Sequence, residues 1–106
     1  MAKSDLEDWL ETRLIQSGLT GYVREFQAIN GRKWRWDFAY PAAKLLIEVH
    51  GGTWGKGGHS SGVGIRRDCE KLNAATVNGW RVLAFTGDMV KDDTAPAVIA
   101  DAILKQ

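Results

Sequence analysis

The chain is poor in the residues that stabilise small secreted domains and zinc-binding domains. It contains a single cysteine, Cys69, and two prolines. One cysteine cannot form an intramolecular disulfide, and no pair of cysteines or of cysteine and histidine has the spacing of a zinc site. Both classes of protein are therefore excluded, and we expect a reducing, cytoplasmic environment and a core position for Cys69.

Long apolar runs are also missing. No segment approaches the roughly 20 apolar residues that cross a bilayer, and the N-terminal segment has no extended apolar stretch. We therefore expect a soluble, unprocessed protein without a membrane partner.

Charge of one sign is not in excess. The formal net charge is +1 at pH 7, which excludes a strongly basic nucleic-acid coat protein but not a local basic patch. Basic residues do gather in two places, Arg24, Arg32, Lys33, Arg35 and then Arg66, Arg67, Lys71.

The apolar content is sufficient for one core. With 106 residues, of which 44% are hydrophobic, and with five tryptophans, the chain suits one domain over residues 1–106. Trp34, Trp36 and Trp80 occur in strand-like patterns, so we expect them in that core.

Hydrophobic periodicity and turn signals predict an α/β fold. The expected elements are a helix from residue 4 or 5 to about 17, strands over 22–29, 33–40 and 44–50, a helix over 65–78, a strand over 80–85 and a helix over 95–105. Asn30 and Gly31 form a turn between the first two strands, and Pro41 ends the second. Residues 51–64 hold seven of the twelve glycines and are expected to form a mobile loop that takes part in function.

Two acids stand out in these strands. Asp37 follows the aromatic run of the second strand, and Glu48 lies within the apolar third strand. A carboxylate in a buried strand needs a cation, a metal or a hydrogen-bond donor as partner. A period of two puts Asp37 opposite the face of Trp34, Trp36 and Phe38.

The same period places Glu48 and His50 on one face, where Asp37 of the neighbouring strand could join them. Converging carboxylates suit Mg²⁺ or Mn²⁺, which could activate water and neutralise phosphate charge during phosphodiester hydrolysis. His50 could orient the water, contact the phosphate or bind the metal. The structural alternative is that Asp37 pairs with Arg35 or Lys33, Glu48 pairs with a lysine, and His50 only ends a strand.

The order of elements, Trp36-Asp37 and Glu48-Val49-His50 together resemble the PD-(D/E)XK nuclease superfamily. Segments 32–38, 68–75 and 79–83 resemble small phage and prophage endonuclease-like proteins of that superfamily, related to very-short-patch repair endonucleases and Holliday junction resolvases. The resemblance implies a restriction-endonuclease-like core of order αβββαβα, with a mixed four-stranded sheet flanked by helices. This chain departs from the pattern at His50, where lysine is usual, and at Trp36, where proline precedes the acid.

The resemblance also implies site residues. The metal ligands would be Asp37, Glu48, the Val49 carbonyl and a first-helix acid, with Glu7 preferred to Glu11. Lys71, from the helix after the loop, could supply the missing lysine. The alternatives are that the helix acids are solvated and that Lys71 is a surface charge or pairs with Asp68.

The implied catalytic set is Asp37, Glu48, His50 and Lys71. The residues expected to bind DNA are Arg32, Lys33, Arg35, Trp54, Lys56, His59, Arg66, Arg67 and Asn73. The predicted function is a divalent-metal-dependent DNA endonuclease, and we expect a homodimer that acts on branched or structured DNA. The alternatives are a non-catalytic DNA-binding module on a nuclease fold and an RNA-directed nuclease.

Overall fold

The structure, a computed structural model, describes residues 2–51 and 62–106. Its elements are α1 (Lys3–Gln16), β1 (Val23–Phe26), β2 (Trp36–Tyr40), the short 3₁₀ helix η1 (Pro41–Ala43), β3 (Leu45–His50), α2 (Gly62–Val77), β4 (Arg81–Thr86), α3 (Gly87–Lys91) and α4 (Thr94–Leu104).

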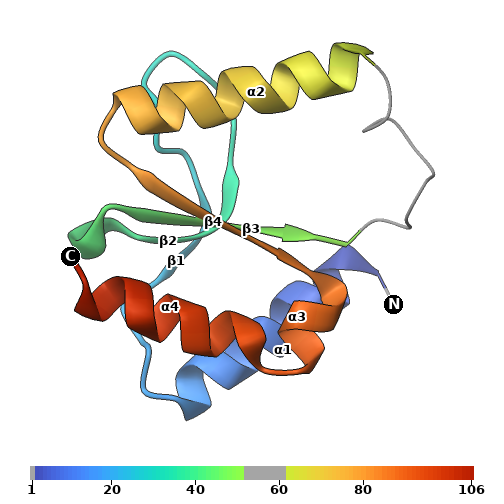
Figure 1. The fold of residues 1–106 in the computed structure, drawn as a ribbon, viewed down its shortest axis with the longest axis vertical. Helices are drawn as coiled ribbons and strands as arrows, with labels where there is room; N and C mark the ends of the chain where they lie inside the picture. Colours follow the sequence, from blue (N-terminus) through green and yellow to red (C-terminus); the bar gives the residue numbers. More distant parts are fainter. Residues whose placement is uncertain (1, 52–61) are drawn as a thin grey trace.

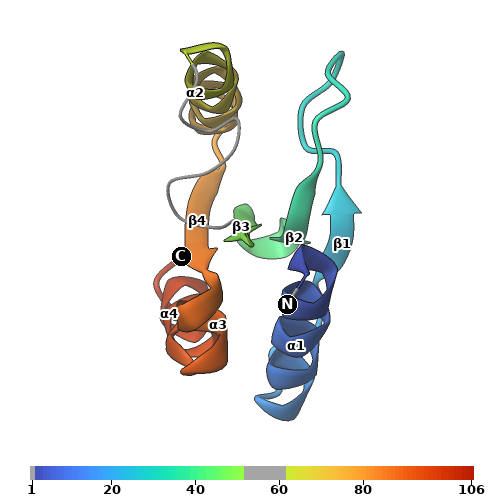
Figure 2. The ribbon, with the colours of Figure 1, turned by 90° about the vertical axis from the view of Figure 1, so that its right-hand side faces the viewer.

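The strands form one mixed sheet in the order β1-β2-β3-β4. Strands β1, β2 and β3 are antiparallel neighbours, and β4 runs parallel to β3. Helix α2 covers one face of the sheet, and α1, α3 and α4 cover the other (Figures 1 and 2). The predicted α/β architecture, of order αβββαβα with flanking helices, is confirmed.

Helix α1 forms because its apolar residues recur once per turn. Leu6, Leu10 and Leu14 are buried and face the sheet, as a helical period requires. The helix begins at Lys3 with Ala2 as N-cap, slightly before the expected start at residue 4 or 5.

Strand β3 is central and covered on both faces, as its apolar sequence predicts. Leu45, Ile47 and Val49 pack into the core beneath α1, α3 and α4. Leu46 packs into a smaller core with Trp36 and Ala75 of α2. Trp36 is buried and Trp34 and Trp80 pack against this second core, so the core prediction for the tryptophans is confirmed.

The β1–β2 hairpin departs from simple alternation. Trp36 belongs to the core on the α2 side and Phe38 to the core on the α1 side, so the prediction that Trp34, Trp36 and Phe38 share a face is wrong. On the paired strand Glu25 has a left-handed backbone with φ 52°. A non-glycine residue rarely adopts that conformation, and it interrupts the strand period.

Several boundaries also differ from expectation. Strands β1 and β2 are shorter than predicted, with a turn at residues 30–31 between them. Helix α2 begins at Gly62 rather than residue 65, and α3 was not predicted. The Thr86 side chain accepts a hydrogen bond from the Met89 amide and caps α3 at its N-terminus.

Helix α2 is less buried than its periodicity suggests. Ala75 is its buried residue, whereas Ile65 and Leu72 are each 50% exposed. Cys69 is exposed as well, so its predicted core position is wrong. Among the described residues, no helix combines the length and apolarity needed to cross a membrane.

Candidate metal centre

Asp37 is buried at the point where β2 and β3 separate. The ladder pairs Phe38 with Ile47, and continuing it by one residue would place Asp37 opposite Glu48. At this point a side chain replaces the backbone carbonyl as hydrogen-bond acceptor: Oδ2 of Asp37 accepts a 2.7 Å hydrogen bond from the Val49 amide. The other oxygen, Oδ1, accepts from Lys3 Nζ at 2.6 Å. The carboxylate is therefore fixed through both oxygens.

Glu7 approaches Asp37 from α1. It is only 6% exposed, because it lies on the helix face that packs against the sheet. Its Oε1 lies 3.1 Å from Arg24 Nη2, and its Oε2 lies 3.3 Å from Lys3 Nζ. Glu11 lies elsewhere, bonded to Tyr22 and Arg24. The structure thus brings Glu7, the preferred helix acid, beside Asp37.

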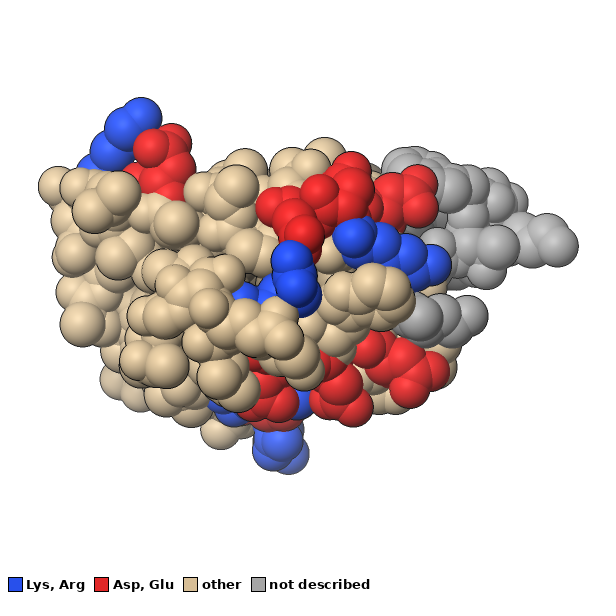
Figure 3. Space-filling model, turned by 90° about the horizontal axis from the view of Figure 1, so that it is seen from below, with Lys and Arg blue, Asp and Glu red and all other residues tan. Residues whose placement is uncertain are grey.

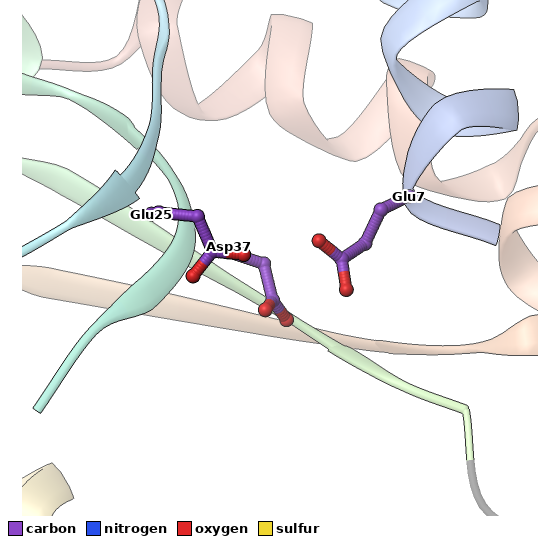
Figure 4. A group of neighbouring side chains, drawn as sticks. All are labelled: Glu7, Glu25 and Asp37. Carbon is purple, nitrogen blue, oxygen red and sulfur yellow. The ribbon is translucent and has the colours of Figure 1, made fainter. Parts of the chain in front are cut away.

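Glu25 completes a group that sequence reasoning missed. One carboxylate oxygen from each of Glu7, Glu25 and Asp37 lies within 4.8 Å of the others. The three side chains converge from α1, β1 and β2 (Figure 4). A signal was present in the sequence: a hairpin centred on Gly31 sets Glu25 opposite Asp37, as the observed pairs on either side confirm.

The chemistry of this group fits a hard divalent cation. Three carboxylates supply oxygen ligands from three separate elements, and two of these residues are buried. Mg²⁺ and Mn²⁺ prefer such oxygens and commonly bind through a few carboxylates. The acidic cluster could therefore bind a divalent metal.

Lys3 provides positive charge at the cluster. Burial lowers the pKa of its ammonium, but the hydrogen bonds and charges of Asp37 and Glu7 outweigh that effect and raise the pKa above its ordinary value. The ammonium therefore stays charged at neutral pH and offsets part of the acids' repulsion.

Glu48 lies outside this group of three and faces the other helical layer. Its Oε1 lies 3.2 Å from Nζ of Lys71, on α2. Lys71 also donates to the Arg35 carbonyl at 2.8 Å, and its Nζ lies 4.6 Å from the centre of the Trp36 ring. Asp37 and Glu48 are thus contacted by lysines from opposite layers, although the charges of Asp37 and Lys3 both act on Glu48. That the two acids share one face stays a prediction.

The surroundings of Glu48 shift its pKa upward from the ordinary value. Burial raises the pKa of Glu48. The charge and hydrogen bond of Lys71 lower it and the charge of Asp37 raises it, and the net shift is upward. Lys71 thus compensates only in part for the burial of this carboxylate.

His50 is the last residue of β3 and is exposed. It follows Val49 directly, so it lies one residue from the amide that fixes Asp37. The roles expected for it stay predictions.

The basic residues expected to bind DNA occupy two neighbouring surfaces. Arg32 stacks on Trp34, with 3.9 Å from its guanidinium carbon to the ring centre, and its Nη2 lies 3.5 Å from Glu70. Arg66, whose Nε lies 3.0 Å from Oε1 of Glu70, is on α2. The remaining described residues that are expected to bind DNA are also exposed; they are Lys33, Arg35, Arg67 and Asn73. Trp54, Lys56 and His59 lie outside the described residues, as does most of the predicted loop.

On the opposite side of the molecule, the described residues carry charge of both signs. Figure 3 views the side of α1, α3 and α4, where basic and acidic side chains adjoin one another. Arg13 and Asp93 form one such pair at 2.6 Å, and Arg24 pairs with Asp8 at 3.0 Å. Mixed charge of this kind gives little net attraction for phosphate.

Comparison with known proteins gives a fold relationship. No protein-family model matches the chain, and no curated protein matches its sequence. Among solved structures, the chain is similar to the catalytic domain of the homing endonuclease I-Bth0305I, with a TM-score of 0.73 and 23% sequence identity. The match covers 94% of this chain and 94% of that domain. The protein therefore has the fold of this endonuclease catalytic domain over nearly its whole length.

Proposed function

We propose that the protein is a divalent-metal-dependent DNA endonuclease that hydrolyses phosphodiester bonds. The observation that carries the proposal is the convergence of Glu7, Glu25 and Asp37. The similarity of the fold to a homing endonuclease catalytic domain gives that convergence a chemical context. Fold alone does not determine function, so the acidic site is the stronger part of the argument.

We assign Asp37, Glu7 and Glu25 as carboxylate ligands of Mg²⁺ or Mn²⁺. The Val49 carbonyl is a further ligand in this proposal, because in an extended strand it points to the same side as the Val49 amide, toward Asp37. When bound, the metal supplies an activated water and neutralises charge developing on the phosphate. The fixed geometry of Asp37 reduces the ordering needed on binding.

Lys71 and His50 act on the substrate in this scheme. Lys71, held beside Glu48, places an ammonium near the ends of β2 and β3. It performs the role of the lysine for which this chain has His50. His50 is exposed and contacts the attacking water or the phosphate. Glu48 has two parts in this proposal, positioning Lys71 and providing a further oxygen at the site.

DNA approaches from the side of α2 and the segment before β2. The exposed cations Arg32, Lys33, Arg35, Arg66 and Arg67 neutralise phosphates there, with Asn73 as a polar contact. Trp54, Lys56 and His59 remain proposed contacts from sequence. A domain of this size offers limited surface, so we propose a homodimer acting on branched or structured DNA, where paired sites suit two strands.

The experiment is a cleavage panel on purified protein. Duplex, flap and four-way-junction DNA are incubated with Mg²⁺, Mn²⁺ or chelator, and light scattering gives the oligomeric state. The variants are Asp37→Asn and Glu7→Gln, with Glu11→Gln as the matched control because Glu11 lies one turn further along α1 and outside the group of three. We expect metal-dependent cleavage that the first two substitutions abolish and the control retains.

Two results would reject the proposal. One is intact DNA under all metal conditions with folded protein that binds DNA, which would identify a non-catalytic DNA-binding module. The other is cleavage that survives both Asp37→Asn and Glu7→Gln, which would place the active centre elsewhere. Preferential cleavage of RNA in the same panel would replace the DNA assignment.

A further inference from the structure

One ammonium bridges the two buried acids of the cluster. Lys3 Nζ lies 2.6 Å from Asp37 Oδ1 and 3.3 Å from Glu7 Oε2. The remaining oxygens of these acids have other partners, the Val49 amide for Asp37 and Arg24 for Glu7. Lys3 therefore contacts the one oxygen of each acid, Asp37 Oδ1 and Glu7 Oε2, that the Val49 amide and Arg24 do not contact.

Local helix chemistry does not explain a lysine at this position. Lys3 is the first residue of α1, where the helix dipole disfavours positive charge. Its pair with Glu7 also has lysine N-terminal to glutamate, the less favourable order. The contact with Asp37, which is 34 residues away in the sequence, compensates for the unfavourable position of this positive charge in the helix.

Packing holds Lys3 in place. Gly51 follows β3, and a Cβ there would come 2.8 Å from Lys3 Cβ and 2.9 Å from Lys3 Cα. The absence of a side chain at Gly51 thus lets the first turn of α1 lie against the end of β3. Figure 1 shows the start of α1 beside that end of the strand.

We propose that Lys3 is the built-in counter-ion of the acidic cluster and that a divalent metal must displace its ammonium in order to bind. This inference rests on the proposed metal site and adds the exchange of one cation for another. A cation offsets part of the negative charge of the cluster in both states, Lys3 without metal and the ion with metal.

The Lys3 ammonium must be displaced because the space beside Asp37 Oδ1 is too small for both cations. Mg²⁺ binds carboxylate oxygens at about 2.0–2.1 Å. An ammonium already lies 2.6 Å from Asp37 Oδ1, so a metal on the same oxygen would meet it at close range and be repelled. Since the Lys3 side chain is 47% exposed, it can leave toward solvent without unfolding the helix.

The test measures metal affinity directly. Mn²⁺ is titrated calorimetrically into the wild-type protein, Lys3→Met, Lys3→Arg and Lys91→Met. The last variant removes the same charge from an exposed position and serves as the matched control. We expect Lys3→Met to bind Mn²⁺ about tenfold more tightly than wild type. The other two variants should stay within about twofold of it.

Thermal unfolding provides a second readout. Without metal, Lys3→Met should unfold at a lower temperature than wild type, because the acids lose their counter-ion. Saturating Mn²⁺ should raise the midpoint of Lys3→Met by more than that of wild type, as linkage requires for a site freed of its competitor. A folded Lys3→Gln variant should behave in the same way.

The outcomes separate this inference from the proposed function. If wild type binds Mn²⁺ and cleaves DNA while Lys3→Met and Lys3→Gln bind the ion no more tightly, the counter-ion role is overturned and the nuclease stands. If no variant binds Mn²⁺ and wild type leaves DNA intact, both proposals fail.

Discussion

The Val49 amide donates a 2.7 Å hydrogen bond to Oδ2 of Asp37, so a side chain stands in for a backbone partner where β2 and β3 separate. This contact explains how a carboxylate only 5% exposed is accommodated in a strand. The other oxygen, Oδ1, is then free of the backbone and accepts a hydrogen bond from Lys3 within the acidic cluster.

Loss of this acceptor should destabilise the metal-free protein. Asp37→Ala leaves the Val49 amide without its partner, and we expect a loss of about 1–3 kcal/mol in the free energy of unfolding. Asp37→Asn keeps a carbonyl acceptor and should lose less. Urea unfolding in chelator measures both, with Glu25→Ala as the control because it removes the same charge from an exposed residue. Equal stability of Asp37→Ala and wild type would contradict the argument.

Glu25 should affect metal affinity more than stability. It is exposed, yet one of its oxygens lies within 4.8 Å of ligand oxygens of Glu7 and Asp37. Glu25→Gln should weaken Mn²⁺ binding by at least the roughly tenfold loss that even outer-shell partners cause. Its urea midpoint should stay near that of wild type. Asp8→Asn, which removes an exposed acid outside the group of three, is the calorimetric control, and an equal loss in both variants would argue against Glu25 as a ligand.

Much of the fold follows from periodicity, whereas the site depends on where that periodicity breaks. The expected succession of elements is observed, because each predicted helix or strand has apolar residues that the sheet or the helices bury. Asp37 and Glu48 were identified from the cost of burying charge. Glu25 was missed, although the hairpin register sets it opposite Asp37, because it lies in an exposed strand position where a carboxylate costs little. Its left-handed backbone, with φ 52°, is a further departure that the sequence does not signal.

Contacts between distant residues were the other limit of sequence reasoning. The sequence predicts that Lys71 could reach the site from its helix but does not name Glu48 as its partner. The same helical pattern predicts a buried Cys69, which is exposed. Helix α2 packs mainly through Ala75, so its wider apolar stripe does not report its contacts. The short helix α3 was missed because five residues are too few to show a period.

The stability of the protein should carry a pH dependence from Glu48. Burial raises the pKa of Glu48, and this effect with the charge of Asp37 exceeds the opposing effect of Lys71. The folded state therefore binds this proton more readily than the unfolded state. The favourable contribution is full below the ordinary carboxyl pKa and is lost as pH rises through the raised pKa.

The measurement compares wild type with Glu48→Gln in chelator from about pH 4 to about pH 7, a range that begins just below the ordinary glutamate pKa. The free energy of unfolding of wild type, relative to the variant, should fall across this range. A difference that stays constant or grows with pH would mean that Lys71 compensates fully for the burial of Glu48.

Arg24 should be the residue through which α1 is held on the hairpin. Its guanidinium pairs with Glu7 at 3.1 Å, Asp8 at 3.0 Å and Glu11 at 3.1 Å, and its central carbon lies 5.1 Å from the centre of the Phe38 ring. Lysine cannot reproduce this forked set of contacts. Arg24→Lys should therefore lower the urea midpoint almost as much as Arg24→Met, and both should loosen Glu7 and weaken Mn²⁺ binding. Arg66→Met, which removes an 84% exposed arginine, should change the free energy of unfolding by no more than about 0.5 kcal/mol. A lysine variant as stable as wild type would show that charge alone, without the forked geometry, holds the helix.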